Sequence, residues 1–188
     1  GNPNRLIHAI PGCDYHFQTR AVDWPWLAGK HPLAPPVWEN PAGAHTSVLA
    51  YYSAAFPKEY WGNLLVSNWG VHGFPSANHV ILRHVIDERG ELINTEPFLT
   101  TTDPRFRPTQ MALAPDGNLY VLDWYGMDDE NDLTGRLYKI SYNGKDAIDE
   151  PSTDKSAATA GLASRNHRTR WLAQQALLAA EPTAAGEQ

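Results

Sequence analysis

Cysteine is almost absent from this chain of 188 residues, which holds Cys13 and no second thiol. A lone cysteine cannot form a disulfide within the chain, and it cannot supply the thiolates of a structural zinc site. It also excludes a Cys-x-x-Cys redox pair. The cysteine count thus excludes a thiolate metal site, and it leaves the redox compartment of the protein open.

The chain also lacks an excess of basic residues, because 15 Lys and Arg stand against 21 Asp and Glu for a formal net charge of −6. A broad basic surface is typical of proteins that hold nucleic acid, so we expect no nucleic-acid partner. No apolar run approaches the ~20 residues that a membrane helix needs, and we expect no transmembrane segment. The chain begins with Gly1 and no signal segment follows, so we expect a piece of a longer protein.

Turn-forming and aromatic residues are abundant instead, with 14 Gly, 15 Pro, 7 Trp, 8 Tyr and 5 Phe. Gly and Pro mark turns, and aromatic residues favour strands. Hydrophobic residues make up 42% of the chain and charged residues 19%, which is the composition of a chain that folds around a core. The composition predicts a mainly β fold.

Two segments of the sequence repeat each other at an offset of 55 residues. Residues 62–69 read Gly-Asn-Leu-Leu-Val-Ser-Asn-Trp, and residues 117–124 read Gly-Asn-Leu-Tyr-Val-Leu-Asp-Trp. Each copy combines a Gly-Asn turn with an apolar run that predicts a strand. Further strand-like runs precede and follow both copies, at residues 48–52, 80–86, 111–114 and 136–142. The pattern predicts one unit of three or four strands that occurs twice.

Repeated units of this kind are typical of β-propeller blades. Residues 92–99 would add a fourth strand to the first unit, and residues 5–10 would end an earlier blade. A closed ring needs roughly four to eight blades, and open strand edges are hazardous. We therefore expect the remaining blades, or another chain, to complete the ring. A single β-sandwich with similar strands is the alternative.

The composition changes after the second unit. Residues 147–161 are small and polar, which is typical of a linker. Asn166 is a good helix N-cap, and apolar residues follow it at helical spacing. The sequence thus predicts a partial propeller over residues 1–146, a linker over residues 147–161 and a helical tail over residues 162–188.

The second unit resembles a known family. Residues 105–125, which begin Arg-Phe-Arg-Pro-Thr-Gln-Met, and residues 135–140 look like a late blade of the glucose/sorbosone dehydrogenase type of six-bladed propeller. Residues 4–15 resemble a mid-ring strand and turn of that family, and residues 44–64 resemble its following blade. The resemblance implies a mainly β fold, namely about half of a six-bladed β-propeller with a short C-terminal α-helical tail.

In that family a pyrroloquinoline quinone (PQQ) lies over the propeller axis, and two arginines at the start of a late blade contact it. Arg105 and Arg107 match this element, so the resemblance implies that they bind the cofactor. Alternate residues of an extended segment point to one side, where two guanidiniums can clamp carboxylates or a quinone oxygen. The alternative is that both are loop arginines paired with Asp103 or Asp123. Relatives carry a cofactor lysine where this chain has the loop of residues 69–74.

The family's general-base histidine and calcium-turn residues belong to the first half of the ring, outside this sequence. The resemblance therefore implies PQQ and calcium in a full-length parent and assigns no cofactor to this chain alone. Residues 162–177 are similar to the start of a HEAT-type helical repeat, as in large bacterial proteins that join such a propeller to HEAT repeats and often to a cytochrome c domain. This likeness implies a cytochrome c electron acceptor and export to the periplasm.

Other residues offer further candidates. His45 precedes a predicted inner strand, where propeller side chains face the central channel, so we consider a metal or proton-transfer role beside a structural one. Residues 128–132 are acidic but lack EF-hand spacing, and we interpret them as a solvated loop. Trp38 and residues 24–26 belong to a long connection that would form a rim for sugars or a protein. Surface or capping roles are expected for the other histidines, His8, His16, His72, His79 and His84.

Two functions remain open at this point. One is a fragment of a quinone-dependent sugar or aldehyde dehydrogenase, which we expect to be inactive alone and whose catalytic residues the sequence does not identify. The other is a noncatalytic propeller module that binds carbohydrate or a protein partner. Absorbance and activity after addition of quinone and calcium would separate the two.

Overall fold

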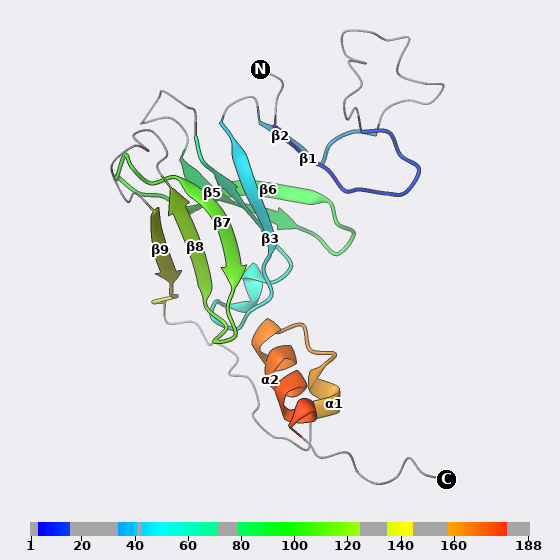
Figure 1. Cartoon of the computed structure of the whole chain (residues 1–188). Coiled ribbons are helices and arrows are strands. Elements are labelled where there is room, and N and C mark those ends of the chain that lie inside the picture. Colours follow the sequence, from blue (N-terminus) through cyan, green and yellow to red (C-terminus); the bar gives the residue numbers. More distant parts are fainter. Residues whose placement is uncertain are drawn as a thin grey trace.

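Two antiparallel sheets make up most of the structure (Figure 1). A computed structural model describes residues 4–15, 34–40, 43–70, 79–124, 135–144 and 158–179. The first sheet, called here blade one, is the meander of β3 (His45–Ala50), β4 (Leu64–Asn68), β5 (Val80–Ile86) and β6 (Leu92–Leu99). Blade two consists of β7 (Pro108–Leu113), β8 (Leu119–Trp124) and β9 (Gly135–Ile140). The remaining elements are β1 (Asn4–Leu6) paired with β2 (Trp38–Asn40), the 3-10 helix η3 (Lys58–Tyr60), α1 (Ala158–Gly161) and α2 (His167–Leu178).

The two blades share one backbone plan. The register of β3 on β4 shifts between His45 and Ser47, and the register of β7 on β8 shifts between Pro108 and Gln110, at the equivalent place. Such an irregularity bends the strand and increases its twist. Because the same irregularity occurs in both sheets, the repeat predicted from the sequence is confirmed at the level of the backbone.

The turns of the two blades repeat as well. Tyr51 N donates to Asn63 O at 2.9 Å in blade one, and Ala114 N donates to Asn118 O at 3.0 Å in blade two. The glycines of the two Gly-Asn motifs, Gly62 and Gly117, have φ angles of 85° and 81°. Only glycine adopts this left-handed region without strain, which explains why both units begin with glycine.

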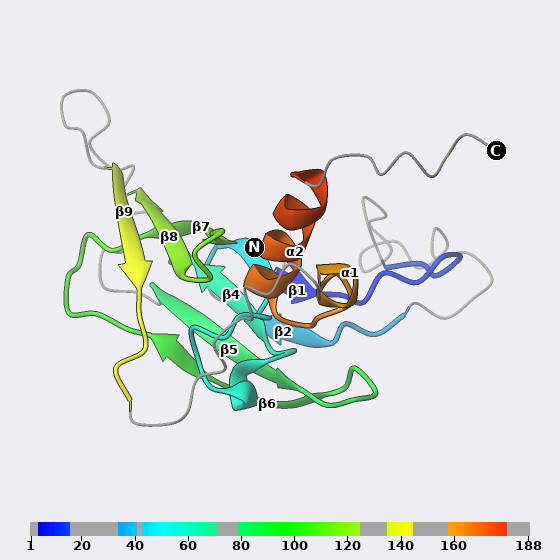
Figure 2. The ribbon, with the colours of Figure 1, turned by 90° about the horizontal axis from the view of Figure 1, so that it is seen from below.

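The blades pack against each other beside their inner strands, β3 and β7. In Figure 2 the sheets are closest at these strands and diverge toward β6 and β9. The core between them is apolar and contains Leu65, Ile81, Met111, Leu119 and Val121. Hydrogen bonds also cross the interface: Thr46 Oγ1 donates to Pro108 O at 3.0 Å, and Trp69 Nε1 donates to Trp124 O at 2.9 Å.

Equivalent residues of the two blades differ in exposure, and this difference decides the architecture. Ile81 of blade one is 0% exposed, whereas its equivalent in blade two, Leu137, is 62% exposed. Conversely, Met111 of blade two is 3% exposed, whereas its equivalent in blade one, Val48, is 56% exposed. The blades thus bury opposite faces of the same repeat.

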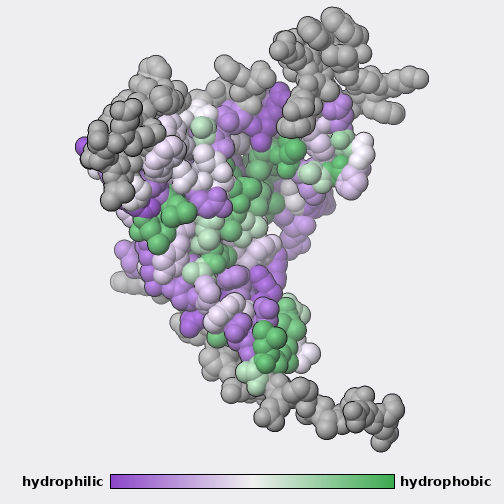
Figure 3. All heavy atoms as spheres, viewed as in Figure 1, coloured by the Kyte–Doolittle hydropathy of each residue, from purple (hydrophilic) through white to green (hydrophobic). Residues whose placement is uncertain are grey.

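Such an arrangement is head-to-tail, so that another blade could stack on either outer face in the same way. A β-sandwich of two sheets related by a two-fold axis would instead bury the same face of each, so the packing favours the propeller over the sandwich alternative. The apolar outer face of blade two, with Leu122 and Leu137 exposed, is visible over β8 and β9 (Figure 3). The structure confirms the predicted fold class, which is mainly β and part of a β-propeller with a short C-terminal helical tail.

Several strand boundaries differ from the predicted ones. Of residues 5–10, which were expected to end an earlier blade, only the first two lie in a strand, β1, Asn4–Leu6. β3 begins at His45 and β7 at Pro108, each three residues before the apolar run that signalled it. Proline fits the first position of a strand because it has no N–H to donate to the ladder. The residues before each bulge do not alternate between apolar and polar, so the sequence pattern gave no signal for these strand starts.

The helical tail begins as predicted, because the side chain of Asn166 accepts a hydrogen bond from Arg168 N at 3.1 Å. The predicted linker is wrong for its last four residues, which form α1. A Cβ on Gly161 would lie 2.8 Å from Cβ of Ala173, so a glycine here lets α1 approach α2 closely. His167 N donates to Tyr52 O at 2.6 Å, which joins α2 to the turn after β3. No helix in the described residues is long and apolar enough to cross a membrane.

The equivalence of Ile81 and Leu137 gives a matched test of the interface between the blades. Ile81→Ala should lower the free energy of unfolding by about 3 kcal/mol, because it leaves a cavity in a closed core. Leu137→Ala should change it by less than about 0.5 kcal/mol, because the outer face is exposed. Urea unfolding of both variants makes the comparison, and equal losses would contradict the packing of the blades.

Candidate functional site

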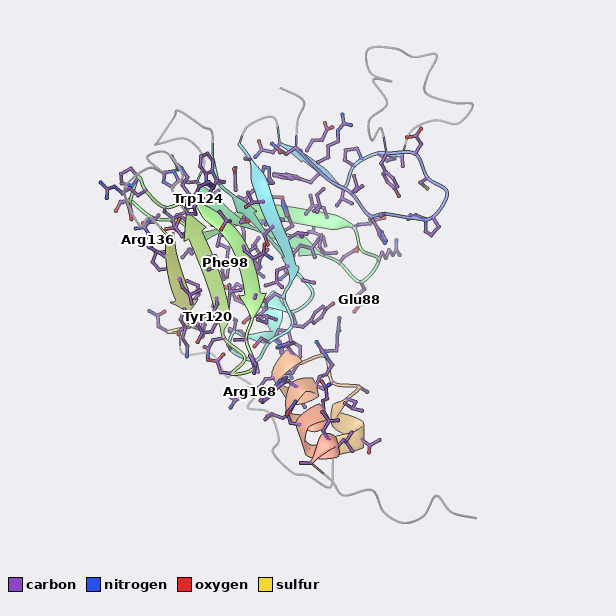
Figure 4. The ribbon with its side chains drawn as sticks, in the orientation of Figure 1. Glu88, Phe98, Tyr120, Trp124, Arg136 and Arg168 are labelled. Atoms are coloured by element: carbon purple, nitrogen blue, oxygen red, sulfur yellow. The ribbon has the colours of Figure 1, made fainter. Side chains whose placement is uncertain are left out.

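Charged side chains gather at one end of blade two. The strands are antiparallel, so the start of β7, the end of β8 and the start of β9 meet at the same edge. Figure 4 shows Trp124 and Arg136 at this end. The charged cluster consists of Asp103, Arg107, Asp123 and Arg136.

Asp123 is the centre of the charged cluster, with only 2% of its surface exposed. Its Oδ1 accepts a hydrogen bond from the backbone N–H of Arg107, and its Oδ2 accepts one from Nε of Arg136 at 2.6 Å. Arg136 also donates from Nη1 to Oδ2 of Asp103 at 2.5 Å. A buried carboxylate is stable only with such partners. These bonds therefore hold the backbone at Arg107, the residue just before β7, in place.

Blade one has neutral residues at the corresponding positions. The equivalent of Asp123 is Asn68, which pairs with Val80 where Asp123 pairs with Arg136. The equivalent of Arg107 is Ala44, because Trp69 N donates to Ala44 O and Trp124 N donates to Arg107 O. A blade of this plan therefore folds without the charges, which means that the charged cluster is a special feature of blade two.

The structure separates Arg105 and Arg107. Arg107 is 1% exposed, and its guanidinium carbon lies 5.3 Å from the centre of the Trp69 ring. Arg105 is exposed, and its backbone N–H donates to Oδ1 of Asp103 at 2.8 Å. The expectation that both guanidiniums face one side is wrong, because the turn from Asp103 to Phe106 interrupts the extended backbone. Asp103 and Asp123 form ion pairs with Arg136, a residue that the sequence reasoning missed.

A signal for Arg136 was present in the repeat. The aligned octets differ in their seventh residue, which is Asn68 in one copy and Asp123 in the other. A carboxylate that enters a buried position needs a cation nearby, and the strand after it carries Arg136 where blade one has Val80.

The charges of the cluster set its protonation states. The hydrogen bond from Arg136 holds the pKa of Asp103 below its ordinary value. Burial lowers the pKa of His79 and so does the charge of Arg107, while Asp103 and Asp123 act in the opposite direction. At neutral pH the lowered pKa of Asp103 keeps its side chain a carboxylate, and the lowered pKa of His79 keeps the imidazole that senses these charges neutral. Arginines can bind anions and a neutral imidazole can accept a proton.

His45, the other candidate, belongs to a separate group with Trp38 and His84. The ring of Trp38 lies 5.1 Å from that of His45 and 4.6 Å from that of His84, measured between centroids. His84 is 0% exposed, and its Nδ1 shares a hydrogen bond with Oγ1 of Thr95 at 2.8 Å. The surface or capping role expected for His84 is wrong, because this face of β5 lies beneath Trp38. The metal or proton-transfer role of His45 stays a prediction.

Several candidates lie outside the described residues: His16, His72, Trp24 to Trp26, and the acidic residues 128–132. Among the residues that the structure does describe, no three His, Cys, Asp or Glu side chains form a group that could hold a metal ion. The charged cluster is thus the arrangement that carries the candidate site.

Comparison with known protein families gives a match to a domain of unknown function named DUF7133, over residues 35–131, just over half of the chain. The chain belongs to the DUF7133 family. The matched range contains the whole of blade one together with β7 and β8 of blade two. The family match therefore includes Asp103, Arg107 and Asp123, while Arg136 follows it.

Among solved structures, the DUF7133 chain is similar to a crystal structure from Thermus thermophilus, provisionally described as an oxidoreductase (glucose dehydrogenase). The two share 22% sequence identity with a TM-score of 0.35. The match covers 59% of this chain and 30% of that one, so the chain spans less than a third of the length of its solved relative. A comparison with curated proteins found no match.

The ion pairs of Arg136 can be tested by its removal from the DUF7133 chain. Arg136→Met should lower the free energy of unfolding by about 2 kcal/mol, because it leaves the buried carboxylate of Asp123 without its cation. Arg105→Met is the matched control and should cost less than about 0.5 kcal/mol, since Arg105 is exposed. Chemical denaturation measures both, and an Arg136 variant as stable as the control would contradict the geometry of the charged cluster.

The buried His84 predicts a dependence of stability on pH. Burial and the neighbouring His45 lower the pKa of His84 from 6.5 to about 4. Between these two pH values the unfolded chain binds the proton that the folded chain excludes. The free energy of unfolding should therefore fall below pH 6.5, by up to about 1.4 kcal/mol per pH unit.

Replacement by glutamine isolates this contribution. His84→Gln should reduce the loss of stability between neutral and acidic pH, whereas His8→Gln, at an exposed position, should leave it unchanged. Urea midpoints across the pH range make the measurement, and a slope that is the same in His84→Gln and the parent would refute the assignment.

Proposed function

We propose that this chain is one arc of a propeller of the glucose/sorbosone dehydrogenase type, and that the charged end of blade two forms part of its cofactor-binding face. The single observation that supports this role is the replacement of Ala44, Asn68 and Val80 by Arg107, Asp123 and Arg136 at equivalent positions. Folding of a blade does not require these charges, so a ligand is the reason we give for them. The sequence resemblance over residues 105–125 supports the choice of ligand.

The two arginines fit a PQQ site to different degrees. Arg105 is exposed beside the charged cluster, so its guanidinium can form paired hydrogen bonds with a carboxylate of an anionic cofactor. Arg107 is buried, and we assign its guanidinium a positioning role through its contact with the Trp69 ring. When bound, a quinone of this kind supplies the two-electron oxidation of a sugar or aldehyde.

The remaining parts of this proposal rest on the exposed blade faces and on the resemblance. The outer faces with Val48 and Leu137 support completion of the ring by further blades or another chain. Calcium in the parent protein, a cytochrome c acceptor, a HEAT-like continuation and export to the periplasm have the sequence resemblance as their support. We propose that the chain alone is inactive, because half of a ring encloses no complete site.

Titration with PQQ in the presence of calcium tests the proposed face. Quenching of tryptophan fluorescence should report binding, and Arg105→Met should weaken it about tenfold, the effect of losing one charge-assisted pair. Arg89→Met removes an exposed arginine from the turn between β5 and β6 and should have no effect. With glucose and an electron-accepting dye, the chain alone should show no turnover.

Two results would contradict the proposal. If PQQ does not bind, or binds equally to the Arg105 and Arg89 variants, the charged end is not a cofactor-binding face. If the chain alone oxidises substrate, the claim that it acts only as part of a ring is wrong.

A further inference from the structure

A cavity of about 230 Å³ lies where the two blades diverge, between the outer strands of blade one and the end of β9. Its lining includes four aromatic rings and a charged pair, namely Phe56, Tyr60, Phe98, Tyr142, Arg83 and Glu96. None of these residues belongs to the charged cluster or to the group around His84.

The aromatic rings form a connected wall. Phe56 lies 5.6 Å from Phe98 and 5.7 Å from Tyr142, and Tyr60 lies 6.1 Å from Phe98, measured between ring centroids. Phe98, labelled in Figure 4, packs against the apolar core. Because the rings come from both blades, the wall exists only while the blades are packed together. Ring faces of this kind bind the apolar surface of a ligand.

The charged pair supplies the polar side of the cavity. Arg83 and Glu96 are directly opposite on β5 and β6, with 3.1 Å between Nη1 and Oε1. Arg83 also donates from Nη2 to Glu59 O at 2.8 Å and lies 4.0 Å above the ring of Tyr60. These contacts hold the guanidinium in one orientation.

Both members of this pair retain hydrogen-bonding capacity. Nη1 and Nη2 of Arg83 each carry a second N–H besides the one donated to Glu96 or to Glu59. Glu96 accepts from Arg83 at Oε1, from Asn94 at Oε2, and has 41% of its side chain exposed. A ligand that carries adjacent hydroxyl groups could donate to the carboxylate and accept from the guanidinium.

We propose that this cavity binds a single neutral sugar ring. Charge disfavours ionic small ligands: Arg83 repels a cation, Glu96 repels an anion, and the pair together is neutral. Size excludes larger ligands, because sites for drug-sized molecules measure roughly 300–1,000 Å³. A pyranose combines an apolar face for the aromatic wall with hydroxyl groups for the Arg83–Glu96 pair. The proposal does not rest on the proposed cofactor face.

Sugar binding can be measured on the whole chain without any cofactor. D-glucose, D-galactose and D-mannose are titrated into labelled protein, with amide and indole chemical shifts as the readout. We expect at least one to bind with a dissociation constant in the roughly millimolar range that few contacts allow. Shifts should concentrate in β5, β6 and residues 140–143, and cyclohexanol, which lacks adjacent hydroxyl groups, should cause none of them.

Two pairs of variants separate the parts of the site. Glu96→Gln should weaken binding about tenfold through loss of the charged acceptor, while Glu91→Gln, on the turn before β6, should not change it. Tyr142→Phe should retain binding and Tyr142→Ala should abolish it, because the ring face is the part required. The spectrum of each variant shows directly whether it is folded.

The proposal is overturned if none of the three sugars shifts these resonances, or if cyclohexanol shifts them equally, which would make the cavity a general apolar hole. It is also overturned if Glu96→Gln and Glu91→Gln bind alike. PQQ plays no part in this readout, so failure here leaves the proposed cofactor face untouched, and failure of that face leaves this result standing.

Discussion

The apolar contact between the facing sides of the two blades is the interaction on which the rest of the structure depends. Leu65 and Ile81 of blade one and Met111, Leu119 and Val121 of blade two are buried there. Hydrophobic burial is the main favourable contribution to folding, and the described part of the chain has no disulfide to add to it. The same contact sets the angle between the blades, and with it the place of the charged cluster and of the aromatic cavity.

The charged cluster and the aromatic cavity both lie at the edge of the apolar core, where packing constrains the side chains less. The charged cluster occupies strand ends, where Asp123 can be buried and yet reach Arg136 and the backbone of Arg107. The cavity occupies the diverging edge, where the blades separate and Phe56 and Tyr142 close the gap only in part. The charged cluster uses residues that differ between the blades at equivalent positions, while the backbone plan of the blades repeats. The blades therefore share a fold, while the residues at the strand ends, which differ between them, determine what each blade can bind.

Much of the fold could be predicted from the sequence because the repeat is strong. The Gly-Asn turns, the apolar runs after them and the N-cap Asn166 are local signals, and the structure confirms them. Strand starts were missed because Pro108 and His45 precede bulges, which disturb the alternation of apolar residues. The site was predicted only in part. The cofactor role of Arg105 and Arg107 stays a prediction, and the burial of Arg107 against Trp69 and the ion pairs of Arg136 depend on contacts between strands that a linear pattern does not contain. The cavity combines residues from Phe56 to Asn143, which no motif connects.

Contacts between methyl groups in solution test the central claim, the head-to-tail packing of two equivalent blades, most directly. In a methyl-labelled sample, the account predicts nuclear Overhauser effects that connect Leu65 and Ile81 with Leu119 and Val121 across the interface. It also predicts none between Leu137 and any of these four residues, because Leu137 lies on the opposite face of blade two. The account is contradicted if Leu65 and Ile81 show effects only within their own sheet, or if Leu137 takes the place of Val121 in contact with them.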